Sequence, residues 1–371
     1  MTVQGAAQEY REWLAGLLPA DYAERQADYR TDHALRAAHQ RAAFEEGWLI
    51  PSWPRGLGGR GLDPFETIAV KLEGARSQAP RLPSIQSVGV IAPAIRQFGT
   101  EAQIDQLLVP TLRGDLTWAL GMSEPDAGSD LAALSTRATS VDGGFHITGQ
   151  KIWTTQAHTS DWAMLYCRTD RDAPRHKGIS CLLLDLSGAG GVTAREIETG
   201  WPGTDEFCEM FFDETFVGDE WLLGDLDGGW KVAMSALNHE RDMIWINAYV
   251  DVERVLRSTR RYASGALADH VAVELGRLAT DAAALHHTGM RALASEVAGR
   301  PHPEFSILKL LGTEAVQRAC DLALSVAGAE GLADDELLLE DFDALGATIS
   351  GGTSEIQRNI IGERVLGLPR G

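Results

Sequence analysis

The feature that most constrains the fold is a hydrophobic periodicity that changes twice along the chain. From residue 1 to about 115 the apolar residues recur at helical spacing, as in Tyr10, Trp13, Leu14, Leu17 and Leu18. From about 116 to 225 short β-branched and aromatic runs alternate with turn clusters, which is typical of a small antiparallel sheet or barrel. Helical spacing then returns over four long segments: 230–262, 270–297, 304–328 and 354–366.

These changes predict an α+β protein of three units. We expect an α-helical domain over 1–115, a β-domain over 116–225 and a helical bundle over 226–371. A chain of 371 residues is long enough for two or three packed units. The order of elements does not by itself identify a chemistry.

Composition excludes several classes of protein. The chain has 33 Lys and Arg against 53 Asp and Glu, and a net charge of −20 opposes binding to nucleic acid. No stretch approaches the roughly 18 uninterrupted apolar residues of a membrane span, and the composition is that of a globular protein, with 44% hydrophobic and 23% charged residues. The four cysteines have no CxxC or metal-type spacing and the ten histidines are scattered, so we expect no metal site and a reducing compartment. The amphipathic N-terminus, which contains acidic residues, is interpreted as the first helix of a cytoplasmic protein.

The first segment that suggests a binding site is the loop 121–130, GMSEPDAGSD. It combines two hydroxyls, three acids, a proline and two glycines after an apolar stretch, so its N–H groups and hydroxyls suit a polar ligand. The alternative is an ordinary turn with a serine cap.

The second segment is 149–155, GQKIWTT, which reads as a turn into a strand. A large aromatic side chain, Trp153, stands beside Thr154 and Thr155. An aromatic face with hydroxyl donors suits a flat heterocycle such as a flavin. Plain strand packing explains the same residues.

The third segment, 238–241, lies inside a predicted helix. Glu240 shares a helix face with the apolar residues Ala233, Ala236, Leu237, Met243 and Ile244. Burial raises a carboxyl pKa toward the range of a general base, so Glu240 is a candidate for that role. The alternative is a buried Glu that pairs with Arg241 or another arginine.

The fourth segment, 349–357, is a glycine-rich turn that opens a helix. Ser354 and Gln357 have capping-box spacing. The free N–H groups at a helix N-terminus favour an anionic or carbonyl group. Capping alone explains the Ser, Thr and Gln, but it does not require the paired glycines Gly351 and Gly352.

These four segments, in this order, resemble the acyl-CoA dehydrogenase family over essentially the whole chain. The most diagnostic strings are MSEPDAGSD, GQKIWTT and GGTSEIQRNIIGERVLG. The resemblance implies an N-terminal helical domain, a middle antiparallel β-barrel domain and a C-terminal four-helix bundle, with subunits that assemble as a homodimer or homotetramer. It also implies a cytoplasmic flavoprotein oxidoreductase of lipid metabolism, as in fatty acid β-oxidation.

The implied reaction oxidises the Cα–Cβ bond of an acyl-CoA or acyl-carrier thioester. A carboxylate removes the α-proton, FAD accepts the β-hydride at N5, and an electron-transfer flavoprotein receives the electrons. By resemblance the loop residues that line flavin and thioester are Leu120, Met122, Ser123, Gly128 and Ser129. Ser129 also corresponds to a residue near the coenzyme A phosphates, and Trp153, Thr154 and Thr155 correspond to contacts of the flavin ring.

The resemblance extends to the helical bundle. Thr353 and Glu355 correspond to positions on the adenylate side of FAD, and Ser325 and Gly328 to a cofactor-binding turn. Asn238 and Arg241 correspond to the substrate-side pair.

The chain departs from the common family pattern at the base. Many members have the catalytic Glu immediately before Gly-Thr-Ser, where this chain has Gly351. A minority have it on the bundle helix, at the position of Glu240, so we expect Glu240 to be the base. Gly351 would keep a backbone N–H that polarises the thioester carbonyl.

Two further departures affect the half of the flavin site that a neighbouring subunit completes. The segment 260–265 does not match the family Arg-x-x-Phe-Gly motif, and the usual Gln before the turn at 328–331 is Ser325. A heterotetramer of two unlike chains would account for both.

The sequence leaves alternatives open for the substrate and for the class of reaction. The bulky residues Met243, Ile244, Trp245, Ile246 and Tyr249 should in part wall the acyl pocket. They are compatible with a short pocket, with a different path for a large substrate such as a steroid side chain, or with a carrier-bound acyl group. Two alternative hypotheses are a flavin-dependent monooxygenase with the same fold and a catalytically inactive subunit that completes the site of another chain.

Overall fold

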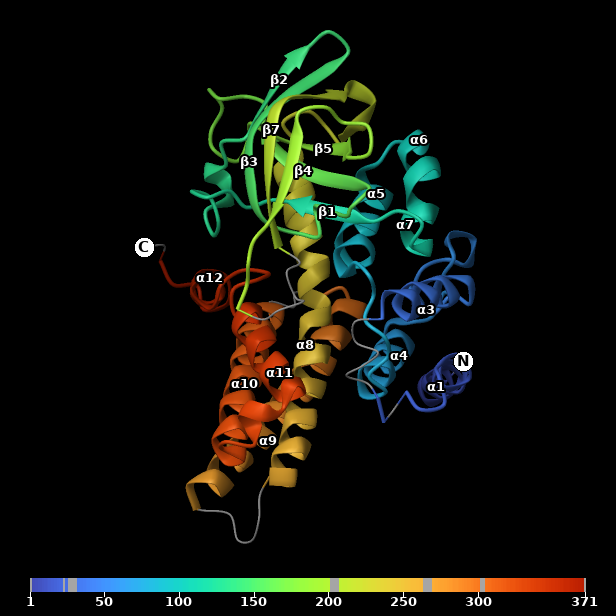
Figure 1. Ribbon diagram of the computed structural model, residues 1–371, viewed down its shortest axis with the longest axis vertical. Helices are drawn as coiled ribbons and strands as arrows, with labels where there is room; N and C mark the ends of the chain where they lie inside the picture. The colour runs from blue at the N-terminus through green and yellow to red at the C-terminus, as the bar shows by residue number, and fades with distance from the viewer. Residues whose placement is uncertain are drawn as a thin grey trace.

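The computed structural model describes residues 2–22, 24–25, 32–200, 207–262, 269–300 and 304–369. Within these ranges the side chains of residues 237–243, 261, 335 and 336 are outside the description. A β-sheet occupies one end of the molecule and a helical bundle the other, and the N-terminal helices lie along one side (Figure 1).

The N-terminal part is helical, as predicted. Its α-helices are α1 (Val3–Leu17), α3 (His33–Glu45), α4 (Pro64–Arg76), α5 (Ala92–Phe98), α6 (Glu101–Gln103) and α7 (Val109–Arg113). Short 3₁₀ and π segments join them at η1 (Arg55–Leu57), η2 (Ser87–Ile91) and η3 (Ile104–Leu108). Helix α4 shows why these boundaries form: Asp63 caps it, Pro64 is its first residue, and Glu66 completes a capping box.

The middle part is a single eight-stranded sheet. Its strands are β1 (Trp118–Gly121), β2 (Arg137–Val141), β3 (Gly144–Thr155), β4 (Trp162–Arg168), β5 (Ile179–Asp185), β6 (Val192–Glu196), β7 (Phe207–Gly218) and β8 (Leu222–Leu223). The order is β6-β7-β3-β2-β4-β5-β8, with β1 paired to β4. The pairing is antiparallel, as predicted, except that β1 and β2 run parallel to β4. The 3₁₀ turns η4 (Leu131–Ala133) and η5 (Asp219–Trp221) lie in its connections.

The central strand β4 is buried on both faces, which explains its uninterrupted apolar sequence. Alternate residues point to opposite faces of a strand. Trp162, Met164 and Tyr166 enter one core, while Ala163, Leu165 and Cys167 enter another.

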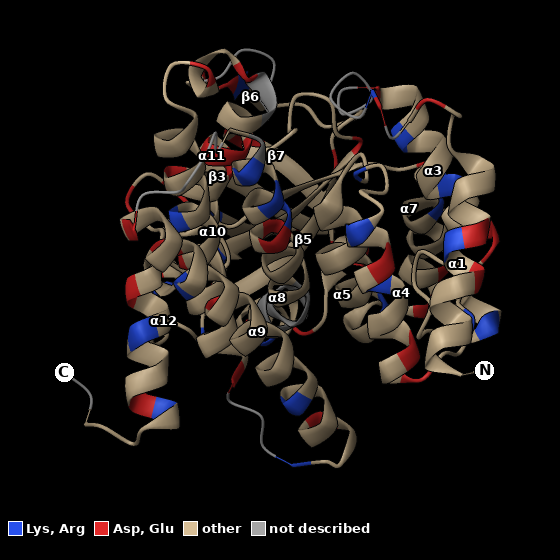
Figure 2. Cartoon of the chain, turned by 90° about the horizontal axis from the view of Figure 1, so that it is seen from below, with Lys and Arg blue, Asp and Glu red and all other residues tan. Residues whose placement is uncertain are grey.

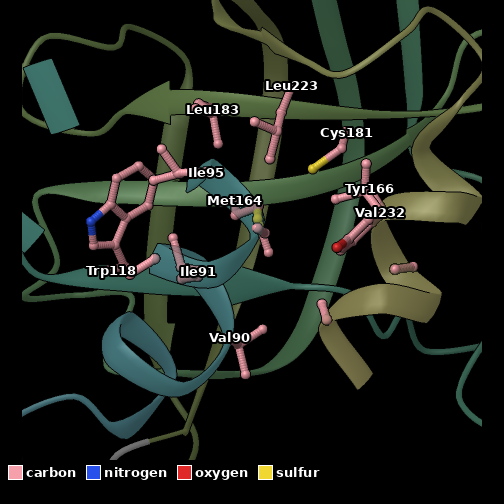
Figure 3. Close-up of a cluster of buried hydrophobic side chains, with 14 of the residues drawn as sticks. Val90, Ile91, Ile95, Trp118, Met164, Tyr166, Cys181, Leu183, Leu223 and Val232 are labelled. Atoms are coloured by element: carbon pink, nitrogen blue, oxygen red, sulfur yellow. The ribbon is translucent and has the colours of Figure 1, made fainter. Parts of the chain in front are cut away.

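The first of these cores joins all three parts of the chain. It combines Ile91 and Ile95 from the N-terminal helices, strand residues such as Met164, and Val232 from helix α8 (Gly229–Tyr262). Figure 3 shows these side chains converging between the helices, the sheet and α8. The loop that follows β1 is therefore held by a core to which each unit contributes.

The C-terminal part is a four-helix bundle with a short helix after it. The helical spacing predicted three of the bundle helices, at 230–262, 270–297 and 304–328, but missed the fourth, and the predicted segment 354–366 lies after this bundle. Its helices are α8, α9 (Asp269–Val297), α10 (Glu304–Ala327) and α11 (Asp335–Ala347), followed by α12 (Ser354–Ile360) and the π turn η7 (Ile361–Val365). The 3₁₀ turn η6 (Gly331–Ala333) precedes α11. Helix α8 runs from the sheet into the bundle and so links the two ends of the molecule (Figure 1).

Charges of both signs are spread over the outer helices. In Figure 2 basic and acidic positions alternate along α1 and α12. None of the described helices combines the length and hydrophobicity that a bilayer crossing requires. Among the described residues no group of three or more His, Cys, Asp or Glu is arranged to hold a metal ion.

Candidate active site

The loop 121–130 begins where β1 ends. Strand β1 lies parallel to β4, and a Cβ at Gly121 would come within 2.5 Å of the Leu165 side chain, which would then have to shift. A pair of backbone hydrogen bonds between Glu124 and Ala127 closes the loop, at 2.9 and 3.0 Å. Beyond that closure Gly128 and Ser129 are exposed.

The loop is fastened to β3 by a buried ion pair. Lys151 is fully buried, and its Nζ lies 2.8 Å from Glu124 Oε1 and 3.1 Å from the Met122 carbonyl oxygen. Beside it, the Ile152 N–H donates to the Ser123 carbonyl at 3.0 Å. The two motifs predicted to bind the flavin therefore meet, although they lie about 30 residues apart.

At the end of β3 the backbone turns out of the regular ladder. The register with β7 shifts between Lys151 and Thr154, and Trp153 has a φ of 59°, in the left-handed region. Trp153 is 56% exposed and meets Phe207 edge to face, with ring centroids 6.0 Å apart. The bulge thus presents a large aromatic surface beside the loop.

The two threonines after Trp153 differ in environment. Thr154 is fully buried, and its hydroxyl has no hydrogen-bond partner in the described part of the chain. Thr155 is partly buried and accepts a hydrogen bond from Gln86 Nε2 at 3.3 Å.

Gln86 is a candidate site residue that the sequence analysis missed. It comes from the N-terminal helices, 69 residues before Thr155. Its Oε1 is buried without a hydrogen-bond partner among the described residues, so it can accept a hydrogen bond from a ligand. Nothing local marks this position, because Gln86 only precedes an apolar helical run.

The predicted base and substrate pair lie on α8. The backbone of 238–241 is helical, but the side chains of Asn238, Glu240 and Arg241 lie outside the described residues. Ala233 and Ala236, which share the predicted face of Glu240, are buried in the core with the sheet. The role of Glu240 stays a prediction.

The predicted wall residues on α8 are largely in the bundle core. Trp245 and Ile246 are buried there, and a Cβ on Gly289 of α9 would clash with the Trp245 ring at 2.6 Å. Tyr249 lines a cavity of about 340 Å³ between α8 and α9, where its hydroxyl donates to Glu253 at 2.9 Å and accepts from Arg76 at 3.2 Å. Ile244 is partly buried, and Met243 is outside the described side chains.

Two buried side chains hold the glycine-rich turn 349–353 by hydrogen bonds to its carbonyl groups. Gln357 Nε2 donates to the Gly351 carbonyl at 3.1 Å, and Lys309 Nζ donates to the Gly352 carbonyl at 2.7 Å. Gly351 and Gly352 have φ values of 63° and 98°, in the left-handed region that favours glycine.

The capping-box prediction for Ser354 and Gln357 is wrong. Thr353 is the N-cap, and its hydroxyl accepts from the Ile356 N–H at 3.3 Å. Ser354 is the first helical residue, and Gln357 turns its amide to Gly351 instead. The N–H of Glu355 and the hydroxyl of Thr353 lower the pKa of the Glu355 carboxyl.

The remaining predicted residues lie at the end of α10. Ser325 is in the last turn of the helix, and Gly328, with a φ of 59°, follows it. Both are exposed. In the described part of the chain, no hydrogen bond or ion pair joins this group or the turn 349–353 to the loop 121–130.

The loop and the end of β3 fit a flavin. Together they offer an exposed aromatic face at Trp153, a free acceptor at Gln86, and the hydroxyls of Ser123 and Ser129, which have no partner among the described residues. A planar heterocycle with donors and acceptors at its edge suits this set.

Family models for acyl-CoA dehydrogenases match three consecutive parts of the chain: the N-terminal domain over 5–115, the middle domain over 119–215 and the C-terminal domain over 227–366. The chain belongs to the acyl-CoA dehydrogenase family. It is therefore an FAD-dependent oxidoreductase of acyl-CoA thioesters.

Named relatives support this assignment. The chain is 34% identical over 378 residues to the acyl-CoA dehydrogenase IpdE1 of Mycobacterium tuberculosis, covering 98% of this chain and 97% of that protein. It is 35% identical over 336 residues to the acyl-CoA dehydrogenase FadE34 of the same organism, covering 89% of this chain. The chain spans about half of FadE34, 46% of its length.

Solved structures of this acyl-CoA dehydrogenase family share the fold over the whole chain. The Tcur3481-Tcur3483 steroid ACAD superposes with a TM-score of 0.87 at 27% identity, covering 100% of this chain and 98% of that one. The ChsE4-ChsE5 complex from Mycobacterium tuberculosis superposes with a TM-score of 0.84 at 28% identity, covering 100% and 98%.

Proposed function

We propose that this acyl-CoA dehydrogenase oxidises the Cα–Cβ bond of its substrate at the loop 121–130, the end of β3, the segment 238–241 of α8 and the turn 349–353. The observation that supports the proposal is the junction of loop and strand, where Lys151 and Ile152 hold Met122 and Ser123 beside the exposed face of Trp153. When bound there, FAD supplies the hydride acceptor.

Glu240 is our proposed base. A carboxylate near the α-carbon takes up the proton, and Ala233 and Ala236, which the helical spacing places on the same face as Glu240, are buried. Asn238 and Arg241 are proposed to orient the thioester from the same helix.

Gly351 is proposed to stabilise the developing charge on the thioester carbonyl. Its carbonyl is tied inward by Gln357, and that of Gly352 is tied inward by Lys309. The N–H groups of Ile349 and Ser350 donate to the Gly346 carbonyl, whereas those of Gly351 and Gly352 have no acceptor among the described residues. A preorganised donor of this kind is commonly worth about 3 kcal/mol in the transition state.

The substrate we propose is a bulky, steroid-derived acyl-CoA. Structural relatives are described as steroid ACADs. Trp245 and Ile246 are buried in the bundle core, so their bulk gives no reason for a short pocket. The reduced enzyme is proposed to pass its electrons to an electron-transfer flavoprotein.

We further propose that a second, unlike chain completes the flavin site. The unmatched segment 260–265 and Ser325 support this, as does the likeness to the Tcur3481-Tcur3483 and ChsE4-ChsE5 complexes.

The test is anaerobic stopped-flow reduction of the FAD-loaded enzyme by steroid-derived and straight-chain acyl-CoA thioesters. We expect Glu240→Gln to keep FAD and to slow flavin reduction by several orders of magnitude, because an amide does not accept the α-proton. Glu253→Gln, the same change further along α8, is the control and should leave the rate within about threefold of the parent, as for a change outside the reacting groups.

Full activity of Glu240→Gln would remove Glu240 from the mechanism. The monooxygenase hypothesis would be favoured if no thioester reduces the flavin of the wild type, while an external reductase reduces it and oxygen reoxidises it. Preference for straight-chain thioesters would contradict the steroid proposal alone.

A further inference from the structure

Lysine is rare in this chain, but one lysine, Lys151, lies buried beside the loop 121–130. Only five of the 33 Lys and Arg residues are lysines, and Lys151, one of the five, is 0% exposed. Its ammonium donates to Glu124 Oε1 at 2.8 Å and to the Met122 carbonyl at 3.1 Å. Lysine suits this position because it is a compact charge, whereas the planar arginine fork needs more room.

The partner carboxylate is fully saturated with donors. Glu124 Oε2 accepts from the Ser135 N–H at 2.6 Å and from the Ser135 hydroxyl at 2.8 Å, and Oε1 accepts from the Thr136 N–H at 2.9 Å. Burial by itself would raise the pKa of Glu124, but the Lys151 charge and these hydrogen bonds outweigh it and lower the pKa to about 2. The Glu124 carboxyl is therefore ionised throughout the physiological pH range.

The pair acts on one particular peptide unit. Because the peptide is trans, the N–H of Ser123 points away from the Met122 carbonyl that Lys151 holds. An ammonium on a carbonyl oxygen polarises the amide and makes its N–H a stronger donor. The Ser123 carbonyl is held as well, by the Ile152 N–H at 3.0 Å.

Of the two charges, the positive one lies against the loop backbone. The ammonium contacts the Met122 carbonyl, whereas the carboxylate contacts the ammonium and the backbone of residues 135 and 136. A flavin that accepts a hydride gains negative charge, and a buried positive charge beside it stabilises the reduced form.

We propose that the buried Lys151–Glu124 pair positions the flavin loop and sets the reduction potential of the bound FAD through the Met122–Ser123 peptide. The inference rests on the proposed assignment of this loop to FAD. Lys151 and Glu124 are positioning residues, since they act through the loop backbone.

The experiment measures the reduction potential of the FAD-loaded enzyme by dye equilibration at pH 6. Glu124→Gln removes the negative partner, so we expect the equilibrium to shift about tenfold toward reduced flavin, which is about 30 mV for a two-electron couple. Lys151→Met removes the positive charge and should shift it about tenfold the other way. The control is Lys177→Met, because Lys177 is exposed in the same domain, and it should leave the potential unchanged.

Opposite signs are the signature of an electrostatic role. A loosened loop would move both variants in the same direction, and that result would overturn the inference. The double variant E124Q/K151M carries no net change of charge, so its potential should return close to that of the wild type.

Folding is followed by near-ultraviolet circular dichroism and by FAD content. Loss of FAD from all three variants, with a folded protein, would overturn the electrostatic role and leave a structural one. A wild type that binds no FAD would instead contradict the proposed site, so the two failures are distinguishable.

Discussion

Single buried groups decide how this acyl-CoA dehydrogenase responds to pH. His39 on α3 is 6% exposed, packs near Trp13, and has no hydrogen-bond partner for either ring nitrogen among the described residues. Burial lowers its pKa from 6.5 to about 4. Below pH 6.5 His39 is therefore protonated in the unfolded chain but not in the folded one. The free energy of unfolding falls as the pH decreases from 6.5 to about 4.

We expect the free energy of unfolding to fall by about 2 kcal/mol between pH 7 and pH 5 from this residue alone. His39→Phe, which keeps a planar ring, should remove that component. Urea unfolding at the two pH values measures it. An equal acid sensitivity in the variant would show that His39 is protonated in the folded state.

The cysteines are a second prediction at this scale. All four are free and buried, and burial raises the pKa of Cys167 and Cys320 to about 12. The pKa values of Cys181 and Cys208 are raised by the same cause. We expect no thiol to react with a disulfide reagent at pH 8 in the folded protein, and all four to react in denaturant. Rapid reaction of any thiol without denaturant would contradict the described packing.

At the scale of elements, Lys309 joins α10 to the turn before α12. It is 1% exposed and donates to the Gly352 carbonyl at 2.7 Å and the Thr348 carbonyl at 3.4 Å. Thr348 caps the C-terminus of α11. The Lys309 ammonium therefore donates both to the end of α11 and to the turn that precedes α12.

Lys309→Met should leave these partly buried carbonyls without the ammonium donor and cost about 1–3 kcal/mol of stability. We expect hydrogen exchange to accelerate over 348–360 while β4 and β5 stay protected. Arg318→Met on the same helix is the control, because Arg318 is exposed and its ion pair with Asp281 contributes little. Uniformly faster exchange in the Lys309 variant would point to global destabilisation instead.

At the scale of the whole molecule, the candidate site is divided. The loop and β3 form one locked group, the turn 349–353 is held separately by Lys309 near the start of α10, and between the described residues no hydrogen bond or ion pair connects the loop to this turn or to the end of α10. This arrangement fits a flavin site that an assembly completes.

We therefore expect the chain purified alone to hold less than one FAD per chain. Co-expression with an unlike acyl-CoA dehydrogenase chain should give a heteromer with more FAD, because the partner supplies the missing contacts. Light scattering after gel filtration and the ratio of flavin to protein absorbance measure both. A homo-oligomer with full FAD and full activity would contradict the heteromeric proposal.

The sequence by itself determined the family, the three-part order and three of the four helices of the bundle, but not α11. These depend on local properties: hydrophobic period, turn residues and motif strings such as MSEPDAGSD lie within short windows. It also indicated that the glycine turn is unusual, since capping does not require paired glycines, whereas plain strand packing was an equally open explanation for Trp153. The capping box failed because Ser354 and Thr353 are both good caps, and only the backbone conformation distinguishes them.

Only the tertiary structure decided which distant residues meet. Glu124 and Lys151 are 27 residues apart, Lys309 and Gly352 are 43 apart, and Gln86 and Thr155 are 69 apart. No local pattern encodes such pairs, because their closeness follows from how the sheet, the N-terminal helices and α8 pack around one shared core and how the bundle helices pack around another. Burial then strengthens these interactions, because water no longer screens the charges or competes for the hydrogen bonds.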